Sequence, residues 1–259
     1  MADKNQRRAW GDELFTALRE RAVVAPLTER FPDITIDDAY HVSRRLLDRR
    51  EAEGEWVVGK KIGVTSEPVQ TMLGVFQPDF GWLTNRMRYG RMMPISEQLI
   101  QPRAEAEIAF VLSKELKGPG VTPEDVLAAT ATVHACFEVV DSRIRDWKIK
   151  IQDTVADNAS SGLFVMGEGV SPVGIDLEAV EVTVHKNGRF LSSGFGRAAL
   201  GSPLKAVAWL ANTLGEFGVA LRAGEVVLSG SLVPLEPVKA GDAMRASIPG
   251  IGDVEVVFT

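Results

Sequence analysis

Three glutamates stand inside apolar stretches of this chain, where a carboxylate needs a partner. Glu105 and Glu107 lie in QPRAEAEIAFVL, and Glu138 lies in HACFEVVDSR. Burying a carboxylate is costly unless it is paired with a cation or bound to a metal. Because these runs supply no matching buried cation, the three glutamates together predict a site for a hard divalent cation. Such a site would serve a metal-dependent enzyme that acts on a small, oxygen-rich anion.

The spacing of the three acids supports this interpretation. On a strand, residues two apart point to one face, about 6.5–7 Å from each other along the backbone, so Glu105 and Glu107 share a face. Glu138 belongs to a second strand, and all three converge if the two strands are neighbours. Oxygen ligands suit Mg²⁺ or Mn²⁺. The spacing alone also fits the solvent side of an edge strand, but the almost wholly apolar segment around Glu138 favours a metal site.

Two further segments carry polar residues that could work beside a metal. In GKKIGVTS, Lys60 and Lys61 lie in an apolar strand, so one of them points inward, where it could hold a carboxylate or carry a proton. The alternative is that both lie at the rim. In QPDFG, Asp79 is in a turn, and from the residues alone a turn-stabilising role is the simpler interpretation.

Two loops rich in hydroxyl groups and glycine could contact an anion through backbone N–H and O–H groups. They are DNASSG, residues 157–162, and LSGSL, residues 228–232. Either loop taken alone also fits ordinary loop composition. The single cysteine, Cys136, is expected to be a small core residue, and His134 is close to it in sequence. The three histidines are scattered, so the sequence contains no zinc-binding cluster.

The composition excludes several classes of protein. The chain has 259 residues, 45% of them hydrophobic and 25% charged, with a net charge of −6. No basic stripe is present, so nucleic acid is not an expected partner. No apolar stretch reaches the roughly 18 residues of a membrane span, and the N-terminus lacks an apolar signal core. A lone cysteine fits a reducing compartment, and we therefore expect a soluble, cytoplasmic protein without a membrane partner.

The periodicity of the chain predicts an α+β fold. Helical spacing covers residues 8–24 and resumes near Asp37, which predicts an N-terminal helical subdomain over residues 1–53. Residues 54–259 are predicted to form a β-rich catalytic domain, with the acidic strands near 104–112 and 132–141. Hairpins are expected around Asn187-Gly188 and Gly250–Gly252. Strands and helices do not alternate regularly, which argues against a doubly wound sheet.

Taken together, the motifs resemble a known enzyme family. The combination of GKKIGVTS, QPDFG, LIQPRAEAEIAF, FEVVDSRIRDWKIKIQDTVADNASSG and LSGSLVPLEPVKAGD is similar to the 2-hydroxypenta-2,4-dienoate (2-oxopent-4-enoate) hydratases. These belong to the fumarylacetoacetate hydrolase fold and serve the meta-cleavage breakdown of aromatic compounds. The resemblance extends from about Pro26 to the C-terminus.

The resemblance implies a mixed β-roll with peripheral helices, an Mg²⁺ or Mn²⁺ centre, and a homo-oligomer built from pentamers, such as a decamer. It implies a lyase that adds water to 2-hydroxypenta-2,4-dienoate to give 4-hydroxy-2-oxopentanoate. It also implies roles for particular residues: metal ligands Glu105, Glu107 and Glu138; catalytic groups Lys61 and Asp79; and substrate contacts Ser161, Ser229, Gly230, Ser231 and Leu232.

Three alternatives remain open at this point. The 4-oxalocrotonate decarboxylases share the three glutamates, the lysine and the ADNASS loop but lack the aspartate of QPDFG, so Asp79 favours the hydratase. A C–C bond hydrolase of the wider fold would be expected to carry a His–Glu arrangement, and the N-terminal half shows none. A non-catalytic binding protein on the same fold would gain support if the carboxylates were exposed and bound no metal.

Overall fold

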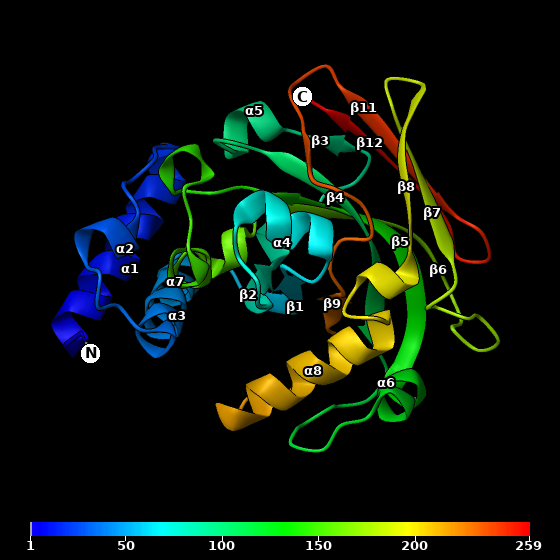
Figure 1. Ribbon diagram of the computed structural model, residues 1–259, viewed down its shortest axis with the longest axis horizontal. Helices are drawn as coiled ribbons and strands as arrows, with labels where there is room; N and C mark the ends of the chain where they lie inside the picture. The colour runs from blue at the N-terminus through cyan, green and yellow to red at the C-terminus, as the bar shows by residue number, and fades with distance from the viewer. Residues whose placement is uncertain (1) are drawn as a thin grey trace.

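Two β-sheets that pack against one another form the centre of the computed structural model, which describes residues 2–259 (Figure 1). Within these residues the larger sheet has the strand order β2-β1-β9-β4-β5-β6, with β10 paired to β4. The smaller sheet has the order β3-β12-β11-β7-β8. The strands of the larger sheet are β1 (Val57–Gly63), β2 (Asp79–Thr84), β4 (Arg103–Leu112), β5 (Thr130–Val140), β6 (Leu163–Val170), β9 (Val226–Leu228) and β10 (Glu236–Pro237). Those of the smaller sheet are β3 (Met92–Met93), β7 (Glu181–Lys186), β8 (Arg189–Phe195), β11 (Ala243–Ile248) and β12 (Gly252–Phe258).

Helices lie around the sheets, with α1, α2, α3 and α7 gathered on one side and α8 on another (Figure 1). Their bounds are α1 (Lys4–Glu20), α2 (Leu27–Arg30), α3 (Ile36–Ala52), α4 (Glu67–Leu73), α5 (Ile95–Gln98), α6 (Pro123–Ala129), α7 (Ile151–Ala156) and α8 (Pro203–Glu216). The α+β class and the mixed-sheet core predicted from the sequence are confirmed.

The first helix begins and ends earlier than the predicted residues 8–24. Asp3 caps its N-terminus by accepting a hydrogen bond from the backbone N–H of Gln6 at 2.9 Å. Arg21 adopts a left-handed conformation, with φ at 52°, and this ends the helix. The apolar periodicity of the sequence therefore located the helix but not its ends, because local capping sets those.

Alternation along β4 explains how one strand serves both the core and a polar site. Ala106, Ile108 and Phe110 point into the main core, which both sheets and α8 share. The residues between them point to the opposite face, which carries Glu105 and Glu107. Since β4 pairs with β5 on one side and with β9 on the other, its acidic face lies in the middle of the larger sheet.

The N-terminal helices pack on a second apolar cluster. It joins Leu14 of α1 and Val42 of α3 to Ile144 and Val155, which come from the segment after β5. A parallel bridge between Val24 and Ile144 ties the same two parts of the chain together. The helical layer therefore packs against the segment that follows the acidic strand β5. The domain boundary at residue 53 stays a prediction.

Across residues 2–259, no helix combines the length and the apolar character that crossing a bilayer requires.

Candidate active site

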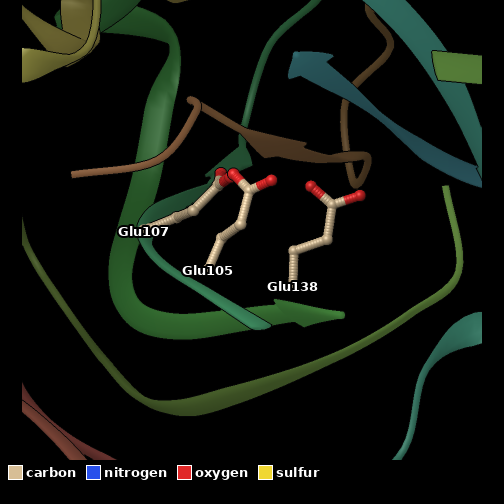
Figure 2. A group of neighbouring side chains, drawn as sticks. All are labelled: Glu105, Glu107 and Glu138. Carbon is tan, nitrogen blue, oxygen red and sulfur yellow. The ribbon is translucent and has the colours of Figure 1, made fainter. Parts of the chain in front are cut away.

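The three predicted metal ligands meet at one point of the larger sheet. Strands β4 and β5 pair antiparallel, and the register places Glu105 directly opposite Glu138. One carboxylate oxygen from each of Glu105, Glu107 and Glu138 lies within 4.8 Å of the other two. Figure 2 shows the three carboxylates directed into the same space. The predicted convergence of two acidic strands is therefore present in the structure.

All three carboxylates are shielded from solvent, with exposed fractions of 7% for Glu105, 0% for Glu107 and 1% for Glu138. Glu107 Oε2 accepts a hydrogen bond from the backbone N–H of Gly230 at 2.8 Å. Within residues 2–259, Glu107 Oε1 and both oxygens of Glu138 have no hydrogen-bond partner. Buried polar atoms in folded proteins are nearly always paired, so these oxygens fit a ligand set that a divalent cation completes. The alternative of a solvent-facing edge strand is wrong.

Electrostatics support the same conclusion. Burial raises the pKa of Glu107 well above its ordinary value, and repulsion from Glu138 and Glu105 raises it further. Burial likewise raises the pKa of Glu138 to about 8, although the nearby Lys61 opposes the shift. Three buried carboxylates in contact repel one another unless a positive charge stands between them. The donor set is all oxygen, which suits Mg²⁺ or Mn²⁺.

Lys61 supplies one positive charge to the cluster. Its Nζ lies 3.4 Å from Glu138 Oε1, an ion pair without hydrogen-bond geometry, and it donates to the carbonyl oxygen of Ala159 at 3.0 Å. Burial lowers the pKa of Lys61, but the carboxylates of Glu138, Glu105 and others outweigh burial and hold that pKa above its usual value. The lysine is therefore charged at neutral pH.

Lys60 is buried as well, on the other face of β1. Its ammonium pairs with Glu225 and lies 5.4 Å from the ring centroid of Trp82. The sequence predicted that one lysine points inward and left open that both lie at the rim; the structure buries both, each against its own carboxylate. The partner of Lys60 is 165 residues away along the chain, so local sequence gave no sign of the pair.

Asp79 lies beside Lys61, across the last residue of β1. It is the first residue of β2 and pairs with Gly63, where a Cβ would lie 2.2 Å from Asp79 Oδ1 and 3.3 Å from Lys61 Nζ. Glycine at position 63 is therefore required for the two side chains to meet. The interpretation of Asp79 as a turn-stabilising residue is wrong, because Asp79 begins strand β2 and is fully buried beside Lys61.

The two oxygens of Asp79 have different surroundings. Thr154 on α7 donates its hydroxyl to Asp79 Oδ2 at 2.9 Å. In the part of the chain that the structure describes, Oδ1 has no hydrogen-bond partner. Burial raises the pKa of Asp79, and the charge of Lys61 and the Thr154 hydrogen bond oppose that shift. Asp79 thus combines a shielded carboxyl group with one oxygen that is available to a substrate or a water molecule.

The predicted contact Ser161 follows a strained turn. Asn158, Ala159 and Ser160 all have left-handed backbone conformations, with φ of 56°, 51° and 50°. This turn directs the Ala159 carbonyl at Lys61. The Ser161 hydroxyl donates to the Asn158 carbonyl at 2.7 Å, so its proton stabilises the turn.

A buried arginine that the sequence analysis did not single out holds this turn in place. Arg143 donates to the Asp157 carboxylate at 2.6 Å, to the Asp157 carbonyl at 2.5 Å and to the Ser161 carbonyl at 3.0 Å. Arg143 and Asp157 both lie in the long central motif, 14 residues apart. The segment between them carries several other acidic and basic residues, so the sequence gave no specific sign of this pair.

The 229–232 segment runs along the other side of β4. Ser229 donates its hydroxyl to the Ile108 carbonyl at 2.8 Å, and Ser231 donates to the Val233 carbonyl at 2.6 Å. The Leu232 N–H donates to the Ala106 carbonyl at 2.9 Å. These bonds fix the segment beside Glu107, and the role of its residues as substrate contacts stays a prediction.

The two remaining candidates, His134 and Cys136, both lie on β5, where Cys136 pairs with Glu107 of β4. Both ring nitrogens of His134 are engaged, one with Thr132 Oγ1 at 2.9 Å and the other with the Gly167 carbonyl at 3.0 Å. Cys136 is fully buried in an apolar cluster that also contains Phe164 and Leu228. The expectation that the lone cysteine is a core residue is confirmed.

Comparisons with known proteins show which proteins this chain resembles. The family described as "Fumarylacetoacetate (FAA) hydrolase C-terminal" matches residues 42–259. A "2-hydroxyhexa-2,4-dienoate hydratase" from Comamonas testosteroni is 57% identical over 263 aligned residues, which cover 100% of both chains. A "2-hydroxypent-2,4-dienoate hydratase" from Pseudomonas putida is 65% identical over 221 residues, which cover 84% of this chain and 100% of the relative. Among solved structures, 4-oxalocrotonate decarboxylase from Pseudomonas putida G7, complexed with magnesium and adipate, matches with a TM-score of 0.95 and 35% identity, covering 100% of this chain and 99% of that chain.

Proposed function

We propose that this chain, which belongs to the fumarylacetoacetate hydrolase family, is a hydratase that adds water to 2-hydroxypenta-2,4-dienoate and releases 4-hydroxy-2-oxopentanoate. The observation that carries the proposal is the buried cluster of three carboxylates with Lys61 and Asp79 beside it. Relatives at 57% and 65% identity are named as hydratases of the corresponding dienoates. The reaction belongs to the meta-cleavage breakdown of aromatic compounds.

Glu105, Glu107 and Glu138 would hold Mg²⁺ or Mn²⁺, since these cations prefer oxygen ligands and three buried oxygens of Glu107 and Glu138 have no hydrogen-bond partner within residues 2–259. When bound, the cation supplies Lewis acidity toward the oxygen atoms of the substrate anion. The magnesium in the decarboxylase from Pseudomonas putida G7 supports a divalent cation in this fold.

The polar residues around the cluster have separate tasks in the reaction. The charged Lys61, fixed by the Ala159 carbonyl, attracts the carboxylate or the C2 oxygen of the substrate. Proton transfer first converts the dienol to a conjugated 2-oxo-3-enoate, whose C4 is electrophilic. Water then adds at C4, and C3 takes up a proton. Asp79, shielded from bulk water and open at Oδ1, is placed to carry the proton or to direct the water.

We also propose a cytoplasmic homo-oligomer built from pentamers. Large apolar side chains on the surface of the single chain support subunit contacts, among them Trp56, Phe76 and Phe190, with exposed fractions of 60%, 73% and 63%.

A decarboxylase acting on 4-oxalocrotonate is the second candidate, because the solved decarboxylase matches over the whole chain. Asp79 argues for the hydratase, because the decarboxylases, which the sequence also resembles, lack an aspartate at this position. The higher identity to the two hydratases, 57% and 65% against 35%, argues in the same direction.

One experiment separates the two candidates. The purified protein with Mg²⁺ is offered 2-hydroxypenta-2,4-dienoate and 4-oxalocrotonate in parallel, and both dienoate absorbance and CO₂ are followed. Loss of the dienoate absorbance without release of CO₂ supports the hydratase. Release of CO₂ from 4-oxalocrotonate, with no reaction of the pentadienoate, identifies a decarboxylase. A third reaction with 2-hydroxyhexa-2,4-dienoate determines which chain length is preferred.

A further inference from the structure

Two consecutive hydroxyl groups that follow strand β1 are buried and have no hydrogen-bond partner within the described residues 2–259. Thr65 and Ser66 have exposed fractions of 4% and 2%. Among the residues from 2 to 259, neither Thr65 Oγ1 nor Ser66 Oγ finds a hydrogen-bond partner. A buried hydroxyl without a partner is destabilising, and such groups recur at binding sites where a ligand completes the bond. The motif GKKIGVTS therefore contains polar groups that the proposed mechanism does not yet use.

Contacts with the 229–232 segment place Thr65 at the edge of the cluster. A Cβ added to Gly230 would lie 2.1 Å from Thr65 Oγ1 and 2.7 Å from Thr65 Cβ, so the threonine side chain stands directly against the glycine backbone. The N–H of the same glycine donates to Glu107 Oε2 at 2.8 Å. One residue thus separates the unpaired hydroxyl from a carboxylate of the proposed metal site.

The backbone, not the hydroxyl, holds Thr65 in this position. The Leu200 N–H donates to the Thr65 carbonyl at 3.3 Å, and Gln70 Nε2 donates to the Val64 carbonyl at 3.1 Å. Val64 has a φ of 58°, a left-handed conformation that a β-branched residue adopts only under strain. The chain therefore keeps an unfavourable turn that directs Thr65 toward Gly230, and the hydroxyl stays free for a ligand.

We propose that Thr65 Oγ1 donates a hydrogen bond to the carboxylate of the bound substrate, which makes Thr65 a recognition residue for 2-hydroxy and 2-oxo acids. The inference rests on the proposed function, and it adds a contact that the function alone does not assign. The pentadienoate carries its oxygen atoms at the C1 carboxylate and at C2, and it is hydrocarbon from C3 to C5. A hydroxyl donor beside Glu107 therefore meets the carboxylate end.

Substrate kinetics of Thr65→Val test the proposal, because valine keeps the shape and removes only the donor. We expect KM for 2-hydroxypenta-2,4-dienoate to rise about 10- to 100-fold, the effect of a lost hydrogen bond to a charged group, while kcat changes less than about threefold. Thr65→Ser restores the hydroxyl and should return KM to within about threefold of the wild-type value. The matched control is Thr183→Val on β7, in the other sheet, which should leave both constants unchanged.

A binding measurement separates failure of this inference from failure of the proposed function. Calorimetry follows 2-oxopentanoate, a saturated 2-oxo acid that cannot be hydrated, into the Mn²⁺-loaded protein. Thr65→Val should bind Mn²⁺ like the wild type and bind 2-oxopentanoate about 10- to 100-fold more weakly. Wild-type affinity for the acid in that variant overturns the role of Thr65 and leaves the hydratase assignment intact. Failure of the wild type to hydrate the dienoate overturns the function instead.

Two other outcomes also decide the question. A loss of kcat with an unchanged KM would assign Thr65 to the chemical step and overturn a recognition role. If Thr65→Val does not fold, Thr65→Ala, which removes atoms and adds none, replaces it in both measurements. Its KM must then rise relative to that of Thr65→Ser for the proposal to stand.

Discussion

The substitution Glu107→Gln probes the proposed metal site with little change in shape. Glu107 is fully buried, and a glutamine can still accept the hydrogen bond from the Gly230 N–H. The substitution removes one negative charge from a cluster in which burial and the repulsion of Glu138 and Glu105 raise the pKa of Glu107. We therefore expect the metal-free variant to be at least as stable as the metal-free wild type.

The expected effect of metal on stability can be worked out from linkage. A cation present at 100 times its dissociation constant stabilises the wild type by about 2.7 kcal/mol. For a domain of this size, each kcal/mol shifts Tm by roughly 2–4 °C, so the wild type gains about 5–10 °C. Removing a residue that hydrogen-bonds to a metal ligand weakens metal affinity about 10- to 100-fold. Removing a ligand itself should therefore weaken metal affinity at least about 100-fold. The variant then gains only about 0.4 kcal/mol, or roughly 1 °C, at the same concentration.

The assay is thermal unfolding followed by circular dichroism, with chelator and then with Mn²⁺. The matched control is Glu168→Gln, the same chemical change at an exposed position of the neighbouring strand β6, which should show the full metal-induced shift. A Glu107→Gln variant that gains the same 5–10 °C as the wild type would refute the assignment of Glu107 as a ligand.

Three more predictions concern the residues around the cluster. Asp79→Asn should lower kcat for hydration by about 100- to 10,000-fold while KM changes little, because it removes a proton-transfer group; steady-state kinetics that show an unchanged kcat would exclude Asp79 from the mechanism. Thr154→Val removes the hydrogen bond that opposes the raised pKa of Asp79, so that pKa should rise further. Since the ionised carboxylate accepts the proton, the acidic limb of the kcat profile should move to higher pH, and Thr154→Ser should restore it; superimposable profiles for Thr154→Val and the wild type would contradict this. Arg143→Met leaves Asp157 buried without its cation and should cost about 3–5 kcal/mol in urea unfolding, whereas a loss below about 1 kcal/mol would show that the turn does not depend on this pair.

The sequence predicted the parts of the site that depend on local pattern. The E-x-E spacing on an apolar strand was sufficient to place Glu105 and Glu107 on one face, because side chains alternate along any strand. The apolar segment around Glu138 predicted a second buried strand, and antiparallel pairing of the two strands brought the acids together. The fold class followed from the same patterns together with the resemblance to a known family.

Residues whose roles depend on distant contacts could not be predicted in this way. Thr154 meets Asp79 across 75 residues of sequence, and Lys60 meets Glu225 across 165. Thr65 becomes notable only because Gly230, from a distant loop, lies against it. Asp79 in QPDFG has the local composition of a turn, and only pairing with Gly63 shows that it is buried next to Lys61. Such roles are set by tertiary packing, which overrides local preference.

The most direct test of the account is turnover before and after removal of divalent cations. Protein treated with a chelator and freed from it is mixed with 2-hydroxypenta-2,4-dienoate, and the dienoate absorbance is recorded while Mg²⁺ or Mn²⁺ is added back. We expect no turnover in the stripped protein and recovery of turnover on addition of the cation. Full hydration by the stripped protein would contradict the proposal that three buried glutamates act through a bound cation.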